Sequence, residues 1–276
     1  MRLVDNIFNS MLGAKSAPAI SAAVQDLDNT AENYNPEVMA WLNSTSWYKG
    51  NPNYMTFEEA AAVDSKQFSG TNNAQKKAIV TFDEARFFTS VTYLAPDAFY
   101  GCELLERITI PDSVTSIGNE VFRSCSSLAL TSLPSGLTSI GNYTFNGCTS
   151  LALTSLPNGI TSISNSAFDG CTSLALTSLP NGLTTIGVQA FQSCLTLKDT
   201  LHEIPSSVTE LGDRAFRYVK FPSLKFLGLT PPTFGTQSIY ALPQKVDCQV
   251  PGASLAEYKE AMKVLTNEGL VIISTY

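Results

Sequence analysis

The chain has 276 residues, of which 44% are apolar and only 15% are charged, and its net charge is −7. This acidic balance argues against nucleic acid or an anionic membrane as a partner, because both require a basic face. No run approaches the 18 consecutive apolar residues of a membrane span, so we also expect no direct membrane insertion.

Residues 1–35 are predicted to form a leader, followed by polar residues that join it to the rest of the chain. A short apolar patch with helix-like spacing precedes Gly, Ser, Ala and Pro. The patch consists of Leu3, Val4, Ile7, Phe8, Met11 and Leu12. These residues form either a flexible or cap-packing segment or an attachment peptide that docks into a larger assembly. Asp5 and Asn6 interrupt the apolar run that a signal peptide needs, so we expect an export segment to be absent or removed.

Residues 36–90 are predicted to form an N-terminal cap. Both Thr56–Glu59 and Thr81–Glu84 match the capping-box pattern T-x-x-E, which predicts helices at about 57–64 and 82–89. The polar stretch between them is expected to be a loop around a short strand.

Residues 91–225 are predicted to be a repeat region. Near-identical segments begin at Leu128, Leu151 and Leu174, so the period is 23 residues, and a looser copy begins at Leu105. In the first of these, 128–133 is expected to be a strand that ends at Pro and Gly, and 137–140 a second strand that ends at Gly-Asn. One such unit cannot bury its own apolar side, but stacked units can.

Stacking in register, at about 4.8 Å per coil, should place equivalent apolar side chains in continuous ladders. The predicted ladders are Ile117, Ile140, Ile163 and Ile186, and Phe99, Phe122, Phe145, Phe168, Phe191 and Phe216. We therefore predict an α+β repeat fold: a β-rich leucine-rich-repeat solenoid of about five to six coils, with a helical N-terminal cap and an α/β C-terminal cap.

The repeat pattern resembles the BspA-like, or Treponema-type, leucine-rich repeats over roughly residues 80–250. The residues that carry the resemblance are Leu105, Ile110-Pro111, Val114 to Gly118, Phe122 and Cys125, with their equivalents in later coils. Such repeats are typical of surface-exposed adhesion and host-interaction proteins of gut and oral bacteria. The resemblance therefore implies a secreted or cell-surface location and a protein or glycan partner on a host or bacterial surface.

Residues 226–276 are predicted to form the C-terminal cap. The pattern Ser254–Glu257 predicts the start of a helix that runs to about Leu265, and 270–274 is expected to be a final strand.

The six cysteines are predicted to be buried free thiols that pack as small apolar side chains. They are Cys102, Cys125, Cys148, Cys171, Cys194 and Cys248, and the first five follow the 23-residue period. A disulfide or redox role is the alternative. No C-x₂-C pair is present, and His202 is the only histidine. Since phosphate-binding, dinucleotide-binding and nucleophile-elbow motifs are also absent, we expect no metal, no cofactor and no enzymatic activity.

The 69 residues from Leu128 to Thr196 contain one charged residue, Asp169. Such a surface offers hydroxyls and amides rather than charge, and we predict that the serine row Ser132, Ser155 and Ser178, with its flanking threonines, binds the partner. Leu130, Leu153 and Leu176 either form an outward apolar stripe or turn inward through an irregular step, and the inward arrangement is the commoner one. The leading hypothesis is an adhesion module, and the alternative is a phage virion protein, a fibre or decoration protein that the leader anchors to neighbouring virion proteins.

Overall fold

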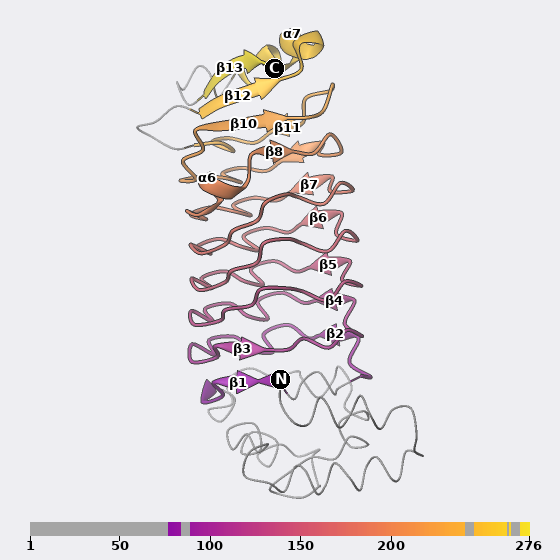
Figure 1. Cartoon of the computed structure of the whole chain (residues 1–276), viewed down its shortest axis with the longest axis vertical. Helices are drawn as coiled ribbons and strands as arrows, with labels where there is room; N and C mark the ends of the chain where they lie inside the picture. The colour runs from indigo at the N-terminus through magenta and orange to yellow at the C-terminus, as the bar shows by residue number, and fades with distance from the viewer. Residues whose placement is uncertain (1–76, 84–88, 241–245, 264, 266–270) are drawn as a thin grey trace, which may run out of the picture.

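A computed structural model describes residues 77–83, 89–240, 246–263, 265 and 271–276 of the chain. They form one elongated stack of coils, with the chain climbing from β1 at one end to β13 and α7 at the other (Figure 1). Short parallel strands line two sides of the stack, which we call the first face and the second face. The leucine-rich-repeat solenoid predicted from the sequence is confirmed.

The second face is a column of seven two-residue strands, one per coil. They are β2 (Tyr93–Leu94), β4 (Ser116–Ile117), β5 (Ser139–Ile140), β6 (Ser162–Ile163), β7 (Thr185–Ile186), β9 (Glu210–Leu211) and β11 (Thr233–Phe234). In each of them the first side chain is more exposed than the second, which points toward the core. The pairing is parallel and in register except between β5 and β6, which belong to separate sheets, and the predicted isoleucines all point inward in one column.

The first face carries strands only toward the two ends of the stack. They are β1 (Thr81–Phe82), β3 (Arg107–Ile108), β8 (Glu203–Ile204), β10 (Ser223–Phe226), β12 (Val246–Val250) and β13 (Val271–Thr275). In the three near-identical coils between β3 and β8, the segments 128–134, 151–157 and 174–180 contain no strand. The strand predicted at 128–133 is therefore wrong.

The reason lies in the order of inward and outward side chains. Leu130 and Leu133 point toward the core, whereas Thr131 and Ser132 between them are both exposed. Side chains of a β-strand alternate between the two sides with a period of two residues, so two successive outward residues are incompatible with a regular strand. The segment is extended, but it cannot join a ladder.

The core is a column of stacked phenylalanines, as predicted. Rings of neighbouring coils lie 5.3–5.4 Å apart between centroids and within 10° of parallel, from Phe99 to Phe216. Phe82 and Phe221 meet the two ends of this column edge-on. Every ring of the column is buried, so the stack acts as the hydrophobic spine of the solenoid.

The turns that carry these phenylalanines also hold the coils together through the main chain. Three backbone hydrogen bonds join each of these turns to the turn of the next coil. From the coil of Phe122 to the next, the N–H groups of Glu120, Phe122 and Ser124 donate to the carbonyl oxygens of Asn142, Thr144 and Asn146, at 2.8–2.9 Å. Two residues of each coil adopt positive φ at these corners, Glu120 and Ser124 in this coil. This turn-side ladder continues without a break along the stack.

The cysteine ladder runs beside the phenylalanines, and all six cysteines are buried and free, as predicted. Each thiol from Cys125 to Cys194 donates to the carbonyl oxygen of a phenylalanine in the preceding coil, at 2.9–3.0 Å; Cys148, for example, donates to Phe122. Burial raises the pKa of these thiols well above their usual value. They therefore pack as neutral side chains at neutral pH.

The C-terminal cap has the predicted helix and strand. The helix α7 covers Leu255–Ala261 after the 3₁₀ turn η2 (Gly252–Ser254), and β13 pairs with β12. Tyr258 of α7 is buried, and its hydroxyl donates to the carbonyl oxygen of Gly228 at 2.9 Å. Ser254 makes no side-chain capping bond, so packing rather than the predicted capping box fixes this helix.

The N-terminal side differs from expectation where it is described. Thr81 and Phe82, predicted to start a helix, form strand β1 and pair with β3. The helix predicted at 57–64, the leader 1–35 and residues 84–88 lie outside the described residues. A four-residue helix that the sequence did not predict, α6 (Leu197–Thr200), begins the longer coil after the central three.

Candidate binding surface

The three central segments of the first face share one geometry. Leu130, Leu153 and Leu176 are 7%, 0% and 0% exposed, so these leucines turn inward and form no outward stripe. The residues that follow them point outward as Thr-Ser pairs, which are exposed in all three coils. The pairs are Thr131-Ser132, Thr154-Ser155 and Thr177-Ser178.

Some polar groups of these segments have no partner within the described part of the chain, whereas others bond to the neighbouring coil, as Ala175 N does to Leu153 O and Thr177 N to Thr154 O, each at 3.1 Å. The hydroxyls of Ser132, Ser155 and Ser178 have no hydrogen-bond partner there, and Leu130 to Leu133 donate no backbone hydrogen bond. One inter-coil bond closes the start of this segment, from Ala129 N to Glu106 O at 2.9 Å. The first face therefore presents donors and acceptors that a partner can use.

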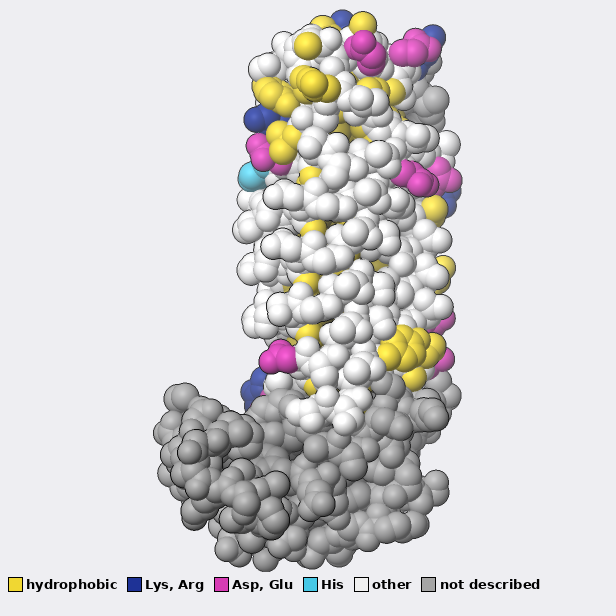
Figure 2. Space-filling view, turned by 90° about the vertical axis from the view of Figure 1, so that its right-hand side faces the viewer, with side chains coloured by type: hydrophobic (Ala, Val, Ile, Leu, Met, Phe, Trp, Pro, Cys, Tyr) yellow, Lys and Arg dark blue, Asp and Glu magenta, His cyan; other side chains and the backbone are white. Residues whose placement is uncertain are grey.

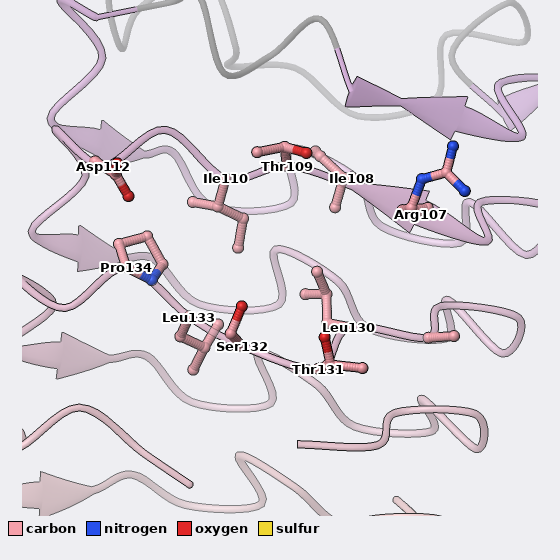
Figure 3. A pocket seen from close by; sticks show the side chains of 11 residues that line it. Arg107, Ile108, Thr109, Ile110, Asp112, Leu130, Thr131, Ser132, Leu133 and Pro134 are labelled. Atoms are coloured by element: carbon pink, nitrogen blue, oxygen red, sulfur yellow. The ribbon is translucent and has the colours of Figure 1, made fainter. Parts of the chain in front are cut away.

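A hollow of about 260 Å³ opens on this face between two coils (Figure 3). Its lining residues come from two consecutive extended segments, and in Figure 3 Ile110 and Ser132 point from opposite walls into the space between them. The lining consists of Arg107, Ile108, Thr109, Ile110 and Asp112 on one wall and Ala129, Leu130, Thr131, Ser132, Leu133 and Pro134 on the other. Of the predicted serine row, Ser132 lines the hollow, while Ser155 and Ser178 lie outside it.

The hollow arises between two coils of equal length in which side chains at equivalent positions point in different directions, one toward the core and the other outward. Leu130 stands at the position of Arg107, and Thr131 stands at the position of Ile108. Because parallel neighbours pair only when their side chains point the same way, a one-residue shift separates the backbones. No backbone hydrogen bond joins residues 107–114 to residues 130–137.

The one cation that lines the hollow, Arg107, is paired with the carboxylate of Asp83. Arg107 donates to Asp83 through Nε and a terminal nitrogen, at 2.7–3.1 Å, and the Thr109 hydroxyl donates to the same carboxylate at 3.4 Å. Asp112 is exposed and has no ion-pair or hydrogen-bond partner among the described residues. The site therefore has no free positive charge with which to hold an anion.

The central coils carry almost no charge, as Figure 2 shows for the side that includes the second face: charged side chains gather toward the ends of the described stack. Asp169, the one charged residue there, is half-buried in the turns, where amide groups of Asn146 and Gln192 donate to it at 3.2–3.3 Å. Burial raises its pKa, and these two donors oppose the rise.

No metal or catalytic constellation stands out in the described part of the chain. No three or more His, Cys, Asp and Glu side chains there lie close enough together to hold a metal ion. His202, the one histidine of the chain, is exposed. None of the described helices is long and apolar enough to cross a membrane.

Sequence reasoning missed the wall that Thr109, Ile110 and Asp112 contribute to the hollow. The available signal was the misalignment of Arg107-Ile108 with Leu130-Thr131 in coils of the same length. The attachment residues proposed for the leader, from Leu3 to Leu12, lie outside the described residues.

Comparisons with known proteins agree with the repeat pattern. Six copies of the BspA-type leucine-rich repeat match residues 92–222. Among solved structures, a Treponema pallidum leucine-rich-repeat protein is 30% identical, with 63% of this chain and 77% of that chain covered and a TM-score of 0.49. A leucine-rich cell surface protein of Faecalibacterium prausnitzii is 26% identical, with 58% and 43% covered and a TM-score of 0.49. No curated protein sequence matches the chain. The six matching repeats show that residues 92–222 of the chain are BspA-type leucine-rich repeats.

Proposed function

We propose that the chain is a non-catalytic recognition module that presents the first face of its central coils to a protein or glycan partner. The observation that supports this best is the interrupted ladder of that face. It leaves the hydroxyls and the main-chain N–H groups of Ser132, Ser155 and Ser178 without a hydrogen-bond partner in the described part of the chain, at regular intervals along the axis. Groups of this kind give short-range, directional recognition.

The scaffold behind this face is suited to hold it rigid. The turn-side ladder and the phenylalanine column continue beneath all three central coils. A surface that is ordered before binding loses less conformational entropy on association. Because the surface is nearly uncharged, its binding should depend little on salt concentration.

The proposed location is the bacterial cell surface, where BspA-type repeats typically serve in adhesion. A virion structural or host-recognition protein of a phage is the second candidate. It is favoured by the helix-like spacing of apolar residues in the leader, which suits docking into a larger assembly. Fractionating cells, membranes and pelleted particles, and quantifying peptides of the chain in each, separates the two locations.

The binding proposal is tested with arginine substitutions on the two faces. The purified chain is labelled, and its binding to immobilised mucin and to intact bacterial and epithelial cells is measured. We expect S132R, S155R and S178R to lose binding while their circular dichroism and unfolding midpoints stay unchanged. S139R and S162R, at exposed serines of the second face, are the matched controls. Equal binding by both sets, or no binding of the unsubstituted chain to any of these surfaces, would contradict the proposal.

A further inference from the structure

We propose that the hollow beside Ser132 binds one neutral sugar residue of a glycan, and that the glycan continues along the Ser155 and Ser178 row. This inference rests on the proposed recognition function and names its ligand class. The observation behind it is the chemical character of the two walls, taken with their size and charge.

The size of the hollow favours a single ring. Its volume of about 260 Å³ lies just below the range of roughly 300–1,000 Å³ that is usual for drug-sized ligands. One sugar residue fits between the two extended segments, which form its long walls.

The walls of the hollow combine apolar and hydrogen-bonding groups, as a sugar ring does. Ile108, Ile110 and Leu133 line the hollow, and Leu133, the most exposed of the three, offers apolar surface that suits the C–H face of a pyranose. Thr131 and Ser132 add hydroxyls, and neither hydroxyl has a partner in the described part of the chain. These groups, with the free main-chain N–H groups of 130–133, suit the hydroxyl rim of the ring.

The electrostatics favour a neutral sugar over an acidic or sulfated one. Arg107 is engaged with Asp83 in a two-nitrogen contact, so its charge is compensated. Asp112 at the other end is an exposed carboxylate, which repels anions and accepts hydrogen bonds from hydroxyls. A phosphate, carboxylate or sulfate would therefore meet net repulsion.

The neighbouring coils extend the site along the stack. Ser155 and Ser178 repeat the position of Ser132 at successive coils, and the ring columns behind them are spaced at 5.4 Å. An extended glycan that runs along the axis would therefore meet a new serine hydroxyl at every coil. Affinity should rise as the oligosaccharide is lengthened from one to about three residues.

The test uses the full chain and a defined set of immobilised oligosaccharides. The neutral probes are gluco-, galacto-, manno- and N-acetylglucosamine oligomers of one to six residues, and sialylated and sulfated oligomers are the charged probes. T131V removes a hydroxyl from the hollow, and D112N removes the carboxylate charge, both with little change of shape. S139R on the second face is the control for surface substitution.

We expect at least one neutral series to bind, with affinity that rises with length, and each hollow variant to weaken it by about tenfold. S139R should bind like the unsubstituted chain. No binding of any neutral probe, preference for the charged probes, or equal binding by T131V, D112N and the unsubstituted chain would overturn the inference. If the chain still binds cells or mucin and free neutral oligosaccharides do not compete, the recognition function stands and only the sugar assignment falls.

Discussion

The hydroxyl of Ser164 donates a 2.7 Å hydrogen bond to the carbonyl oxygen of Ile140. At the same place in other coils a glycine N–H makes the inter-coil bond, as from Gly141 to Ile117 at 2.8 Å and from Gly187 to Ile163 at 2.8 Å. The second face is divided here, because β5 and β6 belong to separate sheets. The side chain of Ser164 thus separates two strands and replaces part of the lost bonding.

The break arises because neighbouring coils come very close at the position that glycine occupies in the other coils, such as Gly141 and Gly187. A Cβ added at Gly141 would lie 2.5 Å from the carbonyl carbon of Gly118. Any side chain at this position must therefore displace one coil from the next, and Ser164 is the position in the central coils where this occurs.

Replacing Ser164 with glycine should let the two sheets join. We expect slower hydrogen exchange at the amides of residues 161–164, because they gain ladder bonds to the preceding coil. The global unfolding free energy should change little, because the lost hydroxyl bond and the added backbone entropy offset the new bonds. Exchange that is unchanged at 161–164 would contradict this account of the break.

Placing a side chain at Gly141 should have the opposite effect. We expect G141A to lower the unfolding free energy by about 1–3 kcal/mol, because the added methyl group forces neighbouring backbones apart. Gly136 is the matched control, since a Cβ there meets nothing within 4 Å. G136A should be neutral or slightly stabilising. Urea unfolding of both variants gives the comparison, and equal losses would count against the close-approach argument.

Truncating a ring in the middle of the phenylalanine column should be strongly destabilising. Phe168 is fully buried and stacks on Phe145 and Phe191 with 5.4 Å between centroids. We expect F168A to lower the unfolding free energy by about 3–5 kcal/mol. V188A, at a partly exposed side chain of the next coil, should change it by less than about 0.5 kcal/mol. A small loss in F168A would show that the column is not the spine of the fold.

The cysteine ladder should make the fold sensitive to alkali. Burial raises the pKa of the Cys148 and Cys171 thiols in the folded chain, whereas an unfolded thiol has a pKa of about 8.5. Their contribution to stability is therefore fully present below about pH 8.5 and declines as the pH rises toward the folded pKa. Replacing both with alanine should reduce the loss of stability between about pH 8.5 and pH 11 in urea titrations. Parallel pH profiles for the two chains would contradict this.

The repeat period alone specifies most of the solenoid. A fixed spacing of Phe145, Phe168 and Phe191 leaves little choice for where those rings go, because a unit of 23 residues buries them only by stacking. The first face could not be predicted in the same way. Whether Leu130 turns inward depends on backbone geometry that two outward residues, Thr131 and Ser132, impose on the coil.

Two other differences have equally local causes. The capping-box pattern at Thr81 was overridden by pairing with β3, which the Arg107–Asp83 ion pair accompanies. The hollow forms because adjacent coils differ in which side chains point inward. The sequence reveals that difference, but it determines neither the volume of the hollow nor which side chains line it. Ser132 could therefore be predicted to lie on the proposed surface from its row, whereas Thr109 and Asp112 could not.

The most direct test of the recognition surface is hydrogen exchange followed by mass spectrometry, with and without the surface or oligosaccharide that binds the chain. Most amides of the first-face segments, among them those of residues 130–133, donate no backbone hydrogen bond in the free chain, so they should exchange rapidly and become protected in the complex. We predict protection in peptides that cover 129–134, 152–157 and 175–180. Protection confined to the second face, around 138–140 and 161–163, would contradict the account.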